Sequence, residues 1–487
     1  MRPTGGELVA RTLSAFGVEV AFVLHGGHLD ALLVGCQAEG IRLVDTRHEA
    51  VAVNAADGYA RASGRVGVAF ATAGAGFLNA ISGLGPAMVD RSPVLVITSS
   101  PPLRDAETNP LQGFVDQVAM AAPMAKWAHR ITVVEEIPRL VELALRKALT
   151  GTPGPVLLDI PIDVLFSRAD DERLSSGAGA VLPLRPAPAA EGVRQALDLL
   201  RAAERPVVIA GGGVRGVAPC PELVEFAELT GIPVFHPGMI AGAMPPEHPL
   251  NGYVARNLTA LDPGPDVVLL LGARFGFYLG GRGGSVVPLS AKVIQVDIDG
   301  AEIGRLRPFT VGITADARET LRALTSAGRD LDWPGRSEWV AAATGVHRRT
   351  PPSAAEDEVV KDRLHPYHAL RALLRAVEPG STVVVDGGEV AAWATMSLHE
   401  ARPHRTMGCG YLGYLGITPG LAIGAQVAEP DRRVVLVIGD GGMGFHAQEF
   451  DTMVRHGLPI LTVVVNNEQW AMSRHGQTLL YLSLIHI

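Results

Sequence analysis

Two polar motifs near the C-terminal end of the chain combine residue types that suit a metal-bound phosphate. Asp440 follows the apolar run 434–438, and Asn466 and Asn467 follow a second apolar run at 460–465. The acid is surrounded by Gly439, Gly441 and Gly442. Mg²⁺ accepts one or two protein oxygens and completes its octahedron with phosphate and water, and glycines let a phosphate approach the backbone closely. The motifs therefore predict a site for a magnesium-bound phosphate.

Two buried parallel strands joined by a helix would bring these motifs together. Both apolar runs are short and rich in Val and Ile, and the segment between them is amphipathic. Ligands of open parallel sheets bind beyond the carboxyl ends of the strands, which is where both motifs lie. A simple Asp-Gly turn and a polar strand end are the alternative interpretation.

The sequence GDG, followed by twenty-four residues and then NN, resembles the signature of the thiamine diphosphate enzymes. The resemblance implies that Asp440, Asn467 and the backbone carbonyl of Gln469 bind the Mg²⁺ that carries the diphosphate of the cofactor. It implies that the three glycines beside Asp440 contact the cofactor. The implied fold is α/β, with three consecutive parallel-sheet domains that are called pyrimidine-binding, central and diphosphate-binding.

Glu49 is the predicted acid/base for activation of the cofactor. Activation requires a carboxyl group that exchanges a proton with the ring atom N1' of the aminopyrimidine, and an apolar environment favours the shared proton. The stretch TRHEAVAVNAADGYAR places Glu49 after a strand and at the start of a helix rich in Ala and Val. Taken alone, this acid would be a helix N-terminal Glu stabilised by the helix dipole. The RHE context matches the family, and the resemblance therefore assigns the catalytic role to Glu49.

Longer motifs resemble benzaldehyde lyase and the acetolactate-synthase-like carboligases. They include LHGGHLDAL, PLQGF and GYLGYLG, and similar stretches occur throughout the chain. The resemblance implies that His28 handles protons of the bound intermediate and that Gln112 contacts the substrate oxygen. Leu415 would hold the cofactor in its bent shape, and the backbone carbonyl of Gly413 would bind its amino group. Gly387 would lie in a second loop that faces the cofactor.

Four positions depart from the benzaldehyde lyase pattern. Ile162 and Ala391 stand where that enzyme has aromatic pocket residues, Cys409 replaces a histidine, and Gly27 replaces an alanine. The loss of two rings predicts a wider, more aliphatic pocket with less stacking on an aryl substrate.

The predicted function is a thiamine diphosphate- and Mg²⁺-dependent carboligase or lyase that makes or cleaves C–C bonds of 2-hydroxy ketones. Its expected partners are a small aldehyde, a 2-hydroxy ketone or a 2-oxo acid. An acetolactate synthase that condenses 2-oxo acids is the main alternative, and a non-catalytic truncated fragment is an alternative from another class. The segment 211–216 lacks the full dinucleotide fingerprint, so FAD is allowed but not favoured. Because the glutamate and the Mg²⁺ loop of one site come from different subunits in the family, a homodimer or homotetramer is expected.

Other metal and disulfide chemistry has little support in the sequence. His25 and His28 have no third ligand at a spacing that suits zinc, and solvated loop histidines are the other interpretation. Cys36, Cys220 and Cys409 are scattered and odd in number, which fits a reducing cytoplasm better than a disulfide scaffold.

The composition is that of an ordinary globular protein. Of the 487 residues, 47% are hydrophobic and 19% are charged, and the formal net charge of -8 argues against nucleic acid as a partner. The sequence has no run of eighteen apolar residues, and Glu7 and Arg11 interrupt any signal-like core. A cytoplasmic protein without a membrane segment is expected.

Composition along the chain predicts three domains, at 1–166, 191–326 and 364–487. Polar, Pro-containing connections at 167–191 and 327–361 separate them. Within each block short apolar runs alternate with helical patterns, which favours parallel sheets covered on both faces. Only twenty residues follow Asn467, so the last domain is expected to be incomplete.

Overall fold

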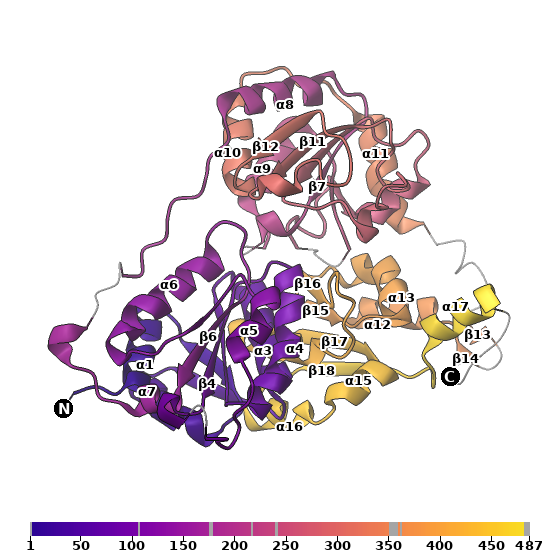
Figure 1. The fold of residues 1–487 in the computed structure, drawn as a ribbon. Coiled ribbons are helices and arrows are strands. Elements are labelled where there is room, and N and C mark those ends of the chain that lie inside the picture. The colour runs from indigo at the N-terminus through magenta and orange to yellow at the C-terminus, as the bar shows by residue number, and fades with distance from the viewer. Residues whose placement is uncertain are drawn as a thin grey trace. The chain divides into compact units, whose positions relative to one another are not determined.

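A computed structural model of the chain describes residues 2–105, 108–174, 179–215, 218–238, 242–349, 359–360 and 363–481. The chain divides into two compact units (Figure 1). One unit joins Met1–Pro183 to Cys409–Ile487, and the other is Leu184–Gly408. Parallel strands and covering helices build both units, which confirms the predicted α/β class with parallel sheets.

The N-terminal sheet has six parallel strands in the order β2-β1-β3-β4-β6-β5. The strands are β1 (Val20–Val23), β2 (Arg42–Asp45), β3 (Gly67–Ala71), β4 (Val94–Ser100), β5 (Trp127–Arg130) and β6 (Val156–Pro161). Apolar runs at 20–24, 41–44, 66–70 and 94–98 predict the first four strands to within two residues. They miss β6, and they miss β5, whose sequence WAHR is half polar and lies at the edge of the sheet.

Helices cover both faces of this sheet because its strands are apolar on both sides. Val68 and Phe70 of β3 face a core with α1 (Gly5–Ala15), α2 (Asp30–Ala38) and α6 (Ile137–Leu149). Ala69 and Ala71, which alternate with them, face a second core. That core contains residues of α3 (Glu49–Ser63), α4 (Ala75–Val89) and α14 (Thr418–Ala428).

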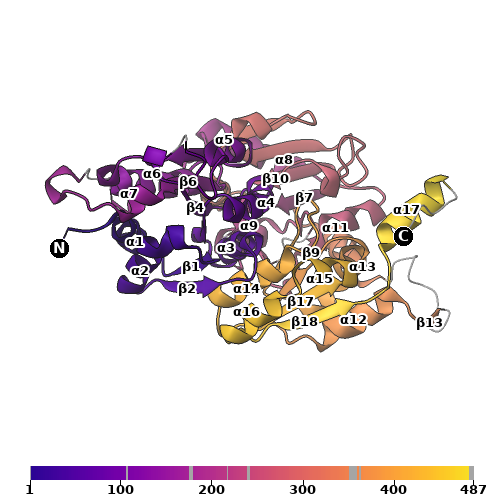
Figure 2. The ribbon, with the colours of Figure 1, turned by 60° about the horizontal axis from the view of Figure 1, so that its bottom comes forward.

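Helix α14 packs directly against α3, although the two helices are far apart in the sequence (Figure 2). Small residues allow this approach. A Cβ added to Gly58 would lie 2.6 Å from the Cα of Leu421, and one added to Gly424 would lie 2.5 Å from the backbone nitrogen of Tyr59. Each of the two helices leads into a parallel strand that ends in a glycine-containing turn, β3 for α3 and β17 (Val434–Gly439) for α14.

The second unit contains the central sheet, with six parallel strands in the order β12-β11-β10-β7-β8-β9. They are β7 (Pro206–Ala210), β8 (Val234–His236), β9 (Asn251–Val254), β10 (Val267–Leu271), β11 (Lys292–Asp297) and β12 (Val311–Thr314). One face packs on α8 (Ala190–Ala202), α9 (Pro221–Thr230) and α10 (Ala317–Gly328).

Helix α11 (Ser337–Gly345) corrects the prediction that 327–361 is only a connection. The helix covers the other face of the central sheet, where Trp339 is 9% exposed. The indole nitrogen of Trp339 donates a hydrogen bond to the carbonyl of Pro206 over 2.9 Å. Buried Trp339 and Ala343 therefore fix a segment whose local composition is typical of a linker.

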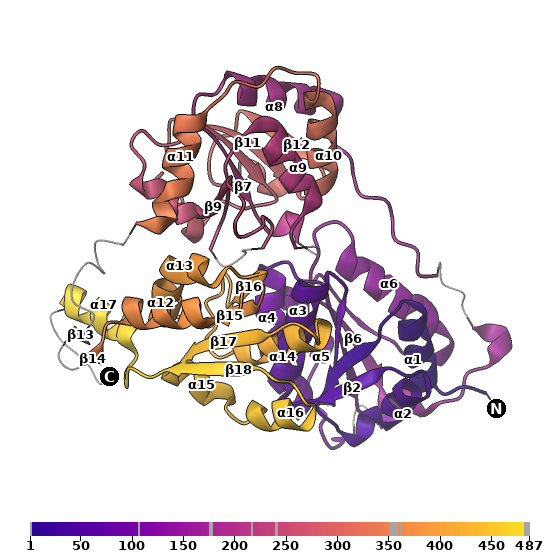
Figure 3. The same ribbon diagram turned by 180° about the vertical axis from the view of Figure 1, so that it is seen from behind.

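The remaining elements form two further pairs of parallel strands. In the second unit β15 (Thr382–Val385) pairs with β16 (Arg405–Gly408), accompanied by α12 (Pro366–Ala376) and α13 (Glu389–Ser397). In the first unit β17 pairs with β18 (Leu461–Val465), and the two strands lie side by side in Figure 3. The helices after them are α15 (Asp440–His446), α16 (Glu449–Arg455) and α17 (Ala471–Tyr481). Of the helices that the structure describes, none is both long and apolar enough to cross a membrane.

Candidate functional site

The two polar motifs of the C-terminal segment meet at one edge of a sheet. Gly439, the last residue of β17, is paired with Val465, the last residue of β18. Because the strands are parallel, Asp440 and Asn466 leave them at the same edge. The side chain of Asp440 is partly accessible at this edge. A carboxylate and an amide therefore follow adjacent strand ends, which is the arrangement that the sequence predicts.

The segment after β18 is tightly curled. Oδ1 of Asn466 accepts a hydrogen bond from the backbone nitrogen of Glu468 over 2.9 Å, and Oδ1 of Asn467 accepts one from Gln469 over 3.2 Å. Glu468 has a positive φ of 58° between these turns. An amide oxygen has a second lone pair, so Asn467 retains the capacity to bind a cation.

Trp470 closes the curled segment against the glycine turn. A Cβ added to Gly441 would lie 2.6 Å from the indole ring of Trp470, so only glycine fits there without movement of the ring. The arrangement fits a magnesium-bound diphosphate in two respects. The oxygen ligands are of the type that Mg²⁺ prefers, and the turn beside Asp440 has no side chains to block a phosphate.

The loop that carries Gly413 and Leu415 is tied to the helix that starts at Asp440. Nδ1 of His446, the last residue of α15, donates a hydrogen bond to the carbonyl of Gly416 over 2.7 Å. Burial lowers the pKa of His446, and the bond to Gly416 opposes that shift. Gly413 has a φ of 62° with no atom within 4 Å of an added Cβ, and Leu415 is half-buried. The geometry therefore fixes this loop relative to Asp440.

Glu49 begins α3, as the sequence predicts, and its side chain is only 7% exposed. His48 is the N-cap of the helix, and its ring nitrogen Nδ1 accepts a hydrogen bond from the backbone nitrogen of Ala50. Nδ2 of Asn79 donates a hydrogen bond to Oε2 of Glu49 over 3.0 Å. Oε1 faces Gly76, where an added Cβ would lie 3.3 Å from it.

The loops that carry His28, Glu49 and Gln112 lie close to one another. The strand order places β1 between β2 and β3, so successive connections leave the sheet in opposite directions there, and ligands bind at such switch points. The glycines of these loops lie against neighbouring loops, since a Cβ added to any of them would collide with a residue there. The residue is Thr72 for Gly26, Gln112 for Gly74, and Thr72 and Glu49 for Gly76. Burial lowers the pKa of His28.

The Gln112 loop is held in an unusual backbone conformation. Asn109, Gln112 and Phe114 all have positive φ values, between 52° and 65°. The buried side chain of Gln117 anchors the end of the loop. Its Oε1 accepts a hydrogen bond from the backbone nitrogen of Gly74 over 2.8 Å. Strain of this kind persists only where the surrounding structure determines it, and it is common at binding sites.

The remaining residues singled out in the sequence belong to other elements. Gly387 follows β15 and Ala391 lies in α13, both in the second unit. Ile162 begins the short helix α7 (Ile162–Phe166), and Cys409 is buried at the start of the loop with Gly413. Nε2 of His25 lies 2.8 Å from Oδ1 of Asp30. The glycine-rich segment 211–216 ends outside the described residues.

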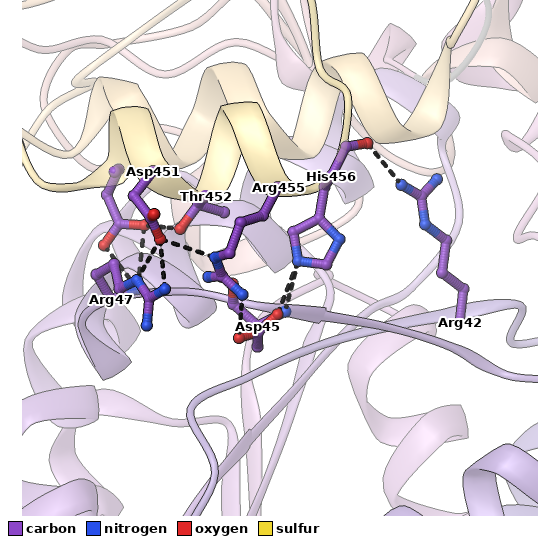
Figure 4. Close-up of polar contacts among 8 residues, drawn as sticks. Arg42, Asp45, Arg47, Asp451, Thr452, Arg455 and His456 are labelled. Atoms are coloured by element: carbon purple, nitrogen blue, oxygen red, sulfur yellow. Dashed lines mark hydrogen bonds and ion pairs between the residues drawn. The ribbon is translucent and has the colours of Figure 1, made fainter.

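Sequence reasoning missed Glu449, which supports the Glu49 loop from α16. Both carboxylate oxygens of Glu449 accept the backbone N–H of Arg47, at 3.1 and 3.2 Å, and the carboxylate is fully buried. The hydroxyl of Thr452 donates to Oε2 over 2.6 Å. Burial raises the pKa of Glu449. Figure 4 shows the surrounding ion pairs between α16 and the end of β2.

Three successive segments of the chain match models of known protein families. Residues 3–120 match the N-terminal TPP binding domain of thiamine pyrophosphate enzymes, residues 193–324 match the central domain, and residues 386–484 match the C-terminal TPP binding domain. The residues of the candidate site fall within the first and third of these matches.

Curated relatives align over almost the whole chain. A probable acetolactate synthase of Mycobacterium bovis is 35% identical over 98% of this chain and 85% of its own length. The acetolactate synthase large subunit of Corynebacterium glutamicum is 33% identical over 99% of this chain and 77% of its own length. A protein of Bos taurus named 2-hydroxyacyl-CoA lyase 2 is 32% identical over 97% of this chain and 80% of its own length.

Proposed function

Because the chain belongs to the thiamine pyrophosphate enzymes, we propose that it binds thiamine diphosphate with Mg²⁺ and makes or cleaves C–C bonds next to a carbonyl group. The observation that carries the proposal is the pairing of Gly439 with Val465, because it supports a shared metal site for Asp440 and Asn467. The third proposed ligand is the backbone carbonyl of Gln469. Gly439, Gly441 and Gly442 would contact the diphosphate.

Further residues would hold the ring portion of the cofactor. The backbone carbonyl of Gly413 would bind the amino group of the cofactor. Leu415 would hold the cofactor in its bent shape. The hydrogen bond between His446 and Gly416 supports this assignment, because it ties their loop to the helix of Asp440. Gly387 is assigned to a second cofactor-facing loop on the family resemblance alone.

Three residues of the N-terminal domain would act on the cofactor and the substrate. When bound, thiamine diphosphate supplies the electron sink that the bond change requires. Glu49 exchanges a proton with N1' of the aminopyrimidine, His28 moves the hydroxyl proton of the substrate, and Gln112 steadies the substrate oxygen. Contacts among the loops that carry these residues support a common site. The lowered pKa of His28 supports a neutral imidazole that can accept a proton near neutral pH.

The substrates proposed first are 2-hydroxy ketones, with cleavage to an aldehyde or the reverse ligation. Ile162 and Ala391 support a wide aliphatic pocket over one built for aryl stacking. Condensation of 2-oxo acids is the second candidate. It is favoured by the acetolactate synthases among the relatives, while the 2-hydroxyacyl-CoA lyase is named for the cleavage of a 2-hydroxyacyl compound.

A homodimer is proposed as the smallest catalytic unit, and a homotetramer is compatible with it. Leu111 is 85% exposed and Phe114 is 87% exposed, and both lie on the loop that carries Gln112. Large apolar side chains exposed beside a candidate site support the burial of this loop against a second copy. Analytical ultracentrifugation tests the proposal, and a fully active monomer would contradict it.

Thermal unfolding tests cofactor binding directly. Thiamine diphosphate and Mg²⁺ added together are expected to raise the melting temperature, because both bind the folded state only. Either component alone is expected to give little change, since the metal bridges the diphosphate to the protein. A protein that shows no shift with both components would overturn the proposed cofactor site.

Product analysis separates the two candidate reactions. Acetoin, benzoin and pyruvate are supplied separately to the loaded enzyme, and the products are identified by NMR. Aldehyde release from acetoin or benzoin supports the lyase, and acetolactate from pyruvate supports the synthase. The absorbance spectrum of the purified protein tests for FAD, whose yellow colour would favour the synthase.

A further inference from the structure

The two carboxylate oxygens of Glu49 have different surroundings. Oε2 accepts a hydrogen bond from Nδ2 of Asn79 over 3.0 Å. Oε1 lies beside Gly76, where an added Cβ would be 3.3 Å from it and 2.7 Å from Cγ2 of Thr72. One oxygen is therefore held by an amide, whereas the other accepts no hydrogen bond from the residues that the structure describes.

We propose that Asn79 is a positioning residue that fixes Oε2 of Glu49 and leaves Oε1 to exchange the proton with the cofactor. The inference rests on the proposed function, and it adds the division of labour between the two oxygens. An amide N–H can only donate, so Asn79 cannot compete with Oε1 for the transferred proton. A carboxylate that receives one fixed hydrogen bond loses rotational freedom, and its second oxygen is thereby aimed.

The local structure favours this role over simple support of the fold. Glu49 begins α3 and Asn79 lies in the second turn of α4, so the bond connects two helices within the same chain. Asn79 itself is exposed, and among the residues that the structure describes its side chain bonds only to Glu49. Loss of its amide should therefore alter Glu49 without unfolding the protein.

Asn79→Ala removes the donor and is the first test. Binding of thiamine diphosphate with Mg²⁺, measured by thermal shift, is expected to change by less than about threefold, because Asn79 does not touch the diphosphate end. Exchange of the C2 proton of the bound cofactor with deuterium, followed by NMR after acid quench, is expected to slow by about tenfold or more, as for loss of one hydrogen bond to a charged group. Exchange at the parental rate would overturn the proposal.

Asn79→Asp is nearly isosteric and tests the same bond with a different readout. A second carboxylate against Oε2 favours protonation of the pair, so the pH at which exchange is half-maximal is expected to rise. If the side chain at position 79 did not contact Oε2, this pH would stay unchanged. An unchanged pH profile would contradict the proposal even if the rate fell.

Ser82→Ala is the matched control. Ser82 lies one turn further along α4, and its hydroxyl donates only to the backbone carbonyl of Asn79. Its exchange rate and pH profile are expected to match the parent. Glu49→Gln separates the proposed role of Glu49 from that of Asn79. Parental exchange in Glu49→Gln would overturn the proposed role of Glu49 and this inference with it, whereas slow exchange there and parental exchange in Asn79→Ala would overturn this inference alone.

Discussion

Nε2 of His456 lies 2.8 Å from Oδ1 of Asp45, although the two residues are 411 positions apart in the chain. Asp45 is the last residue of β2, and His456 follows α16. Arg455 pairs with the same carboxylate, and Arg47 pairs with Asp451. These contacts, drawn in Figure 4, hold the short loop that leads into Glu49. The predicted acid/base is therefore positioned by a segment from the other end of the sequence.

Within this set of contacts, we expect the buried carboxylate to matter more for stability than the exposed ion pairs. Glu449→Ala removes a fully buried carboxylate and leaves the backbone N–H of Arg47 without its acceptor, so about 2–3 kcal/mol of unfolding free energy should be lost. Asp45→Asn affects a side chain that is 42% exposed, where an ion pair contributes less than about 1 kcal/mol. Urea denaturation at pH 7 measures both variants. Equal losses would contradict this ranking.

Local patterns in the sequence predict much of this fold for a physical reason. Buried parallel strands such as 206–210 and 267–271 are apolar on both faces, so they stand out as continuous runs, and their predicted bounds match β7 and β10. The position of Asp440 and Asn467 follows from the same signal, because a strand end is visible where an apolar run stops at glycine or asparagine.

Contacts between distant segments carry no comparable signal. Asn79 and Glu449 look like ordinary helical polar residues, and only the folded chain brings them to Glu49 and Arg47. Helix α11 was predicted as part of a linker, because it is held by the buried residues Trp339 and Ala343 and its sequence lacks a strong helical pattern. Residues of this kind support a site from a distance, and a single sequence does not reveal them.

Because α3 packs closely against α14, even a methyl side chain at Gly58 is expected to lower the free energy of unfolding. Gly58→Ala places a methyl group 2.6 Å from the Cα of Leu421, so the helices must move apart. Overpacking of this type costs about 1–3 kcal/mol. Gly345→Ala is the matched control, because nothing lies within 4 Å of an added Cβ there, and its effect should stay within about 1 kcal/mol. Thermal unfolding measures both variants. Equal melting temperatures for the two would refute the prediction.

In the second unit the rings of Tyr253, His347 and His399 pack together. This cluster is expected to make the protein less stable in mild acid. Burial, aided by the charge of His347, lowers the pKa of His399 to about 4 from 6.5. The unfolded chain therefore takes up this proton near pH 6.5 and the folded protein only near pH 4, so acid favours unfolding throughout that window. The contribution reaches about 3 kcal/mol at the acid end.

His399→Phe keeps a ring beside Tyr253 and His347 but removes the titrating group. The free energy of unfolding of the variant should fall less steeply than that of the parent between pH 6.5 and pH 4. Burial also lowers the pKa of His347, so part of the pH dependence should remain. Urea denaturation at several pH values measures the difference. Parallel curves for parent and variant would show that His399 does not contribute.

Asp440→Asn should separate cofactor binding from folding. Among the described residues no hydrogen bond or ion pair engages the carboxylate of Asp440, so the melting temperature without cofactor should stay close to that of the parent. An amide is a weaker ligand for a hard cation, and the apparent affinity for thiamine diphosphate in the presence of Mg²⁺ should fall by roughly 100-fold or more. Titrations followed by thermal shift measure both quantities.

Asp431→Asn is the control for this change, because Asp431 is an exposed acid in the turn before the same strand and the substitution is identical. Its cofactor affinity should equal that of the parent. If Asp440→Asn bound the cofactor as tightly as Asp431→Asn, the carboxylate at the end of β17 would not be a metal ligand. Asn467 would then have no charged partner with which to bind Mg²⁺. The pairing of Gly439 with Val465 would belong to the sheet without marking a metal site.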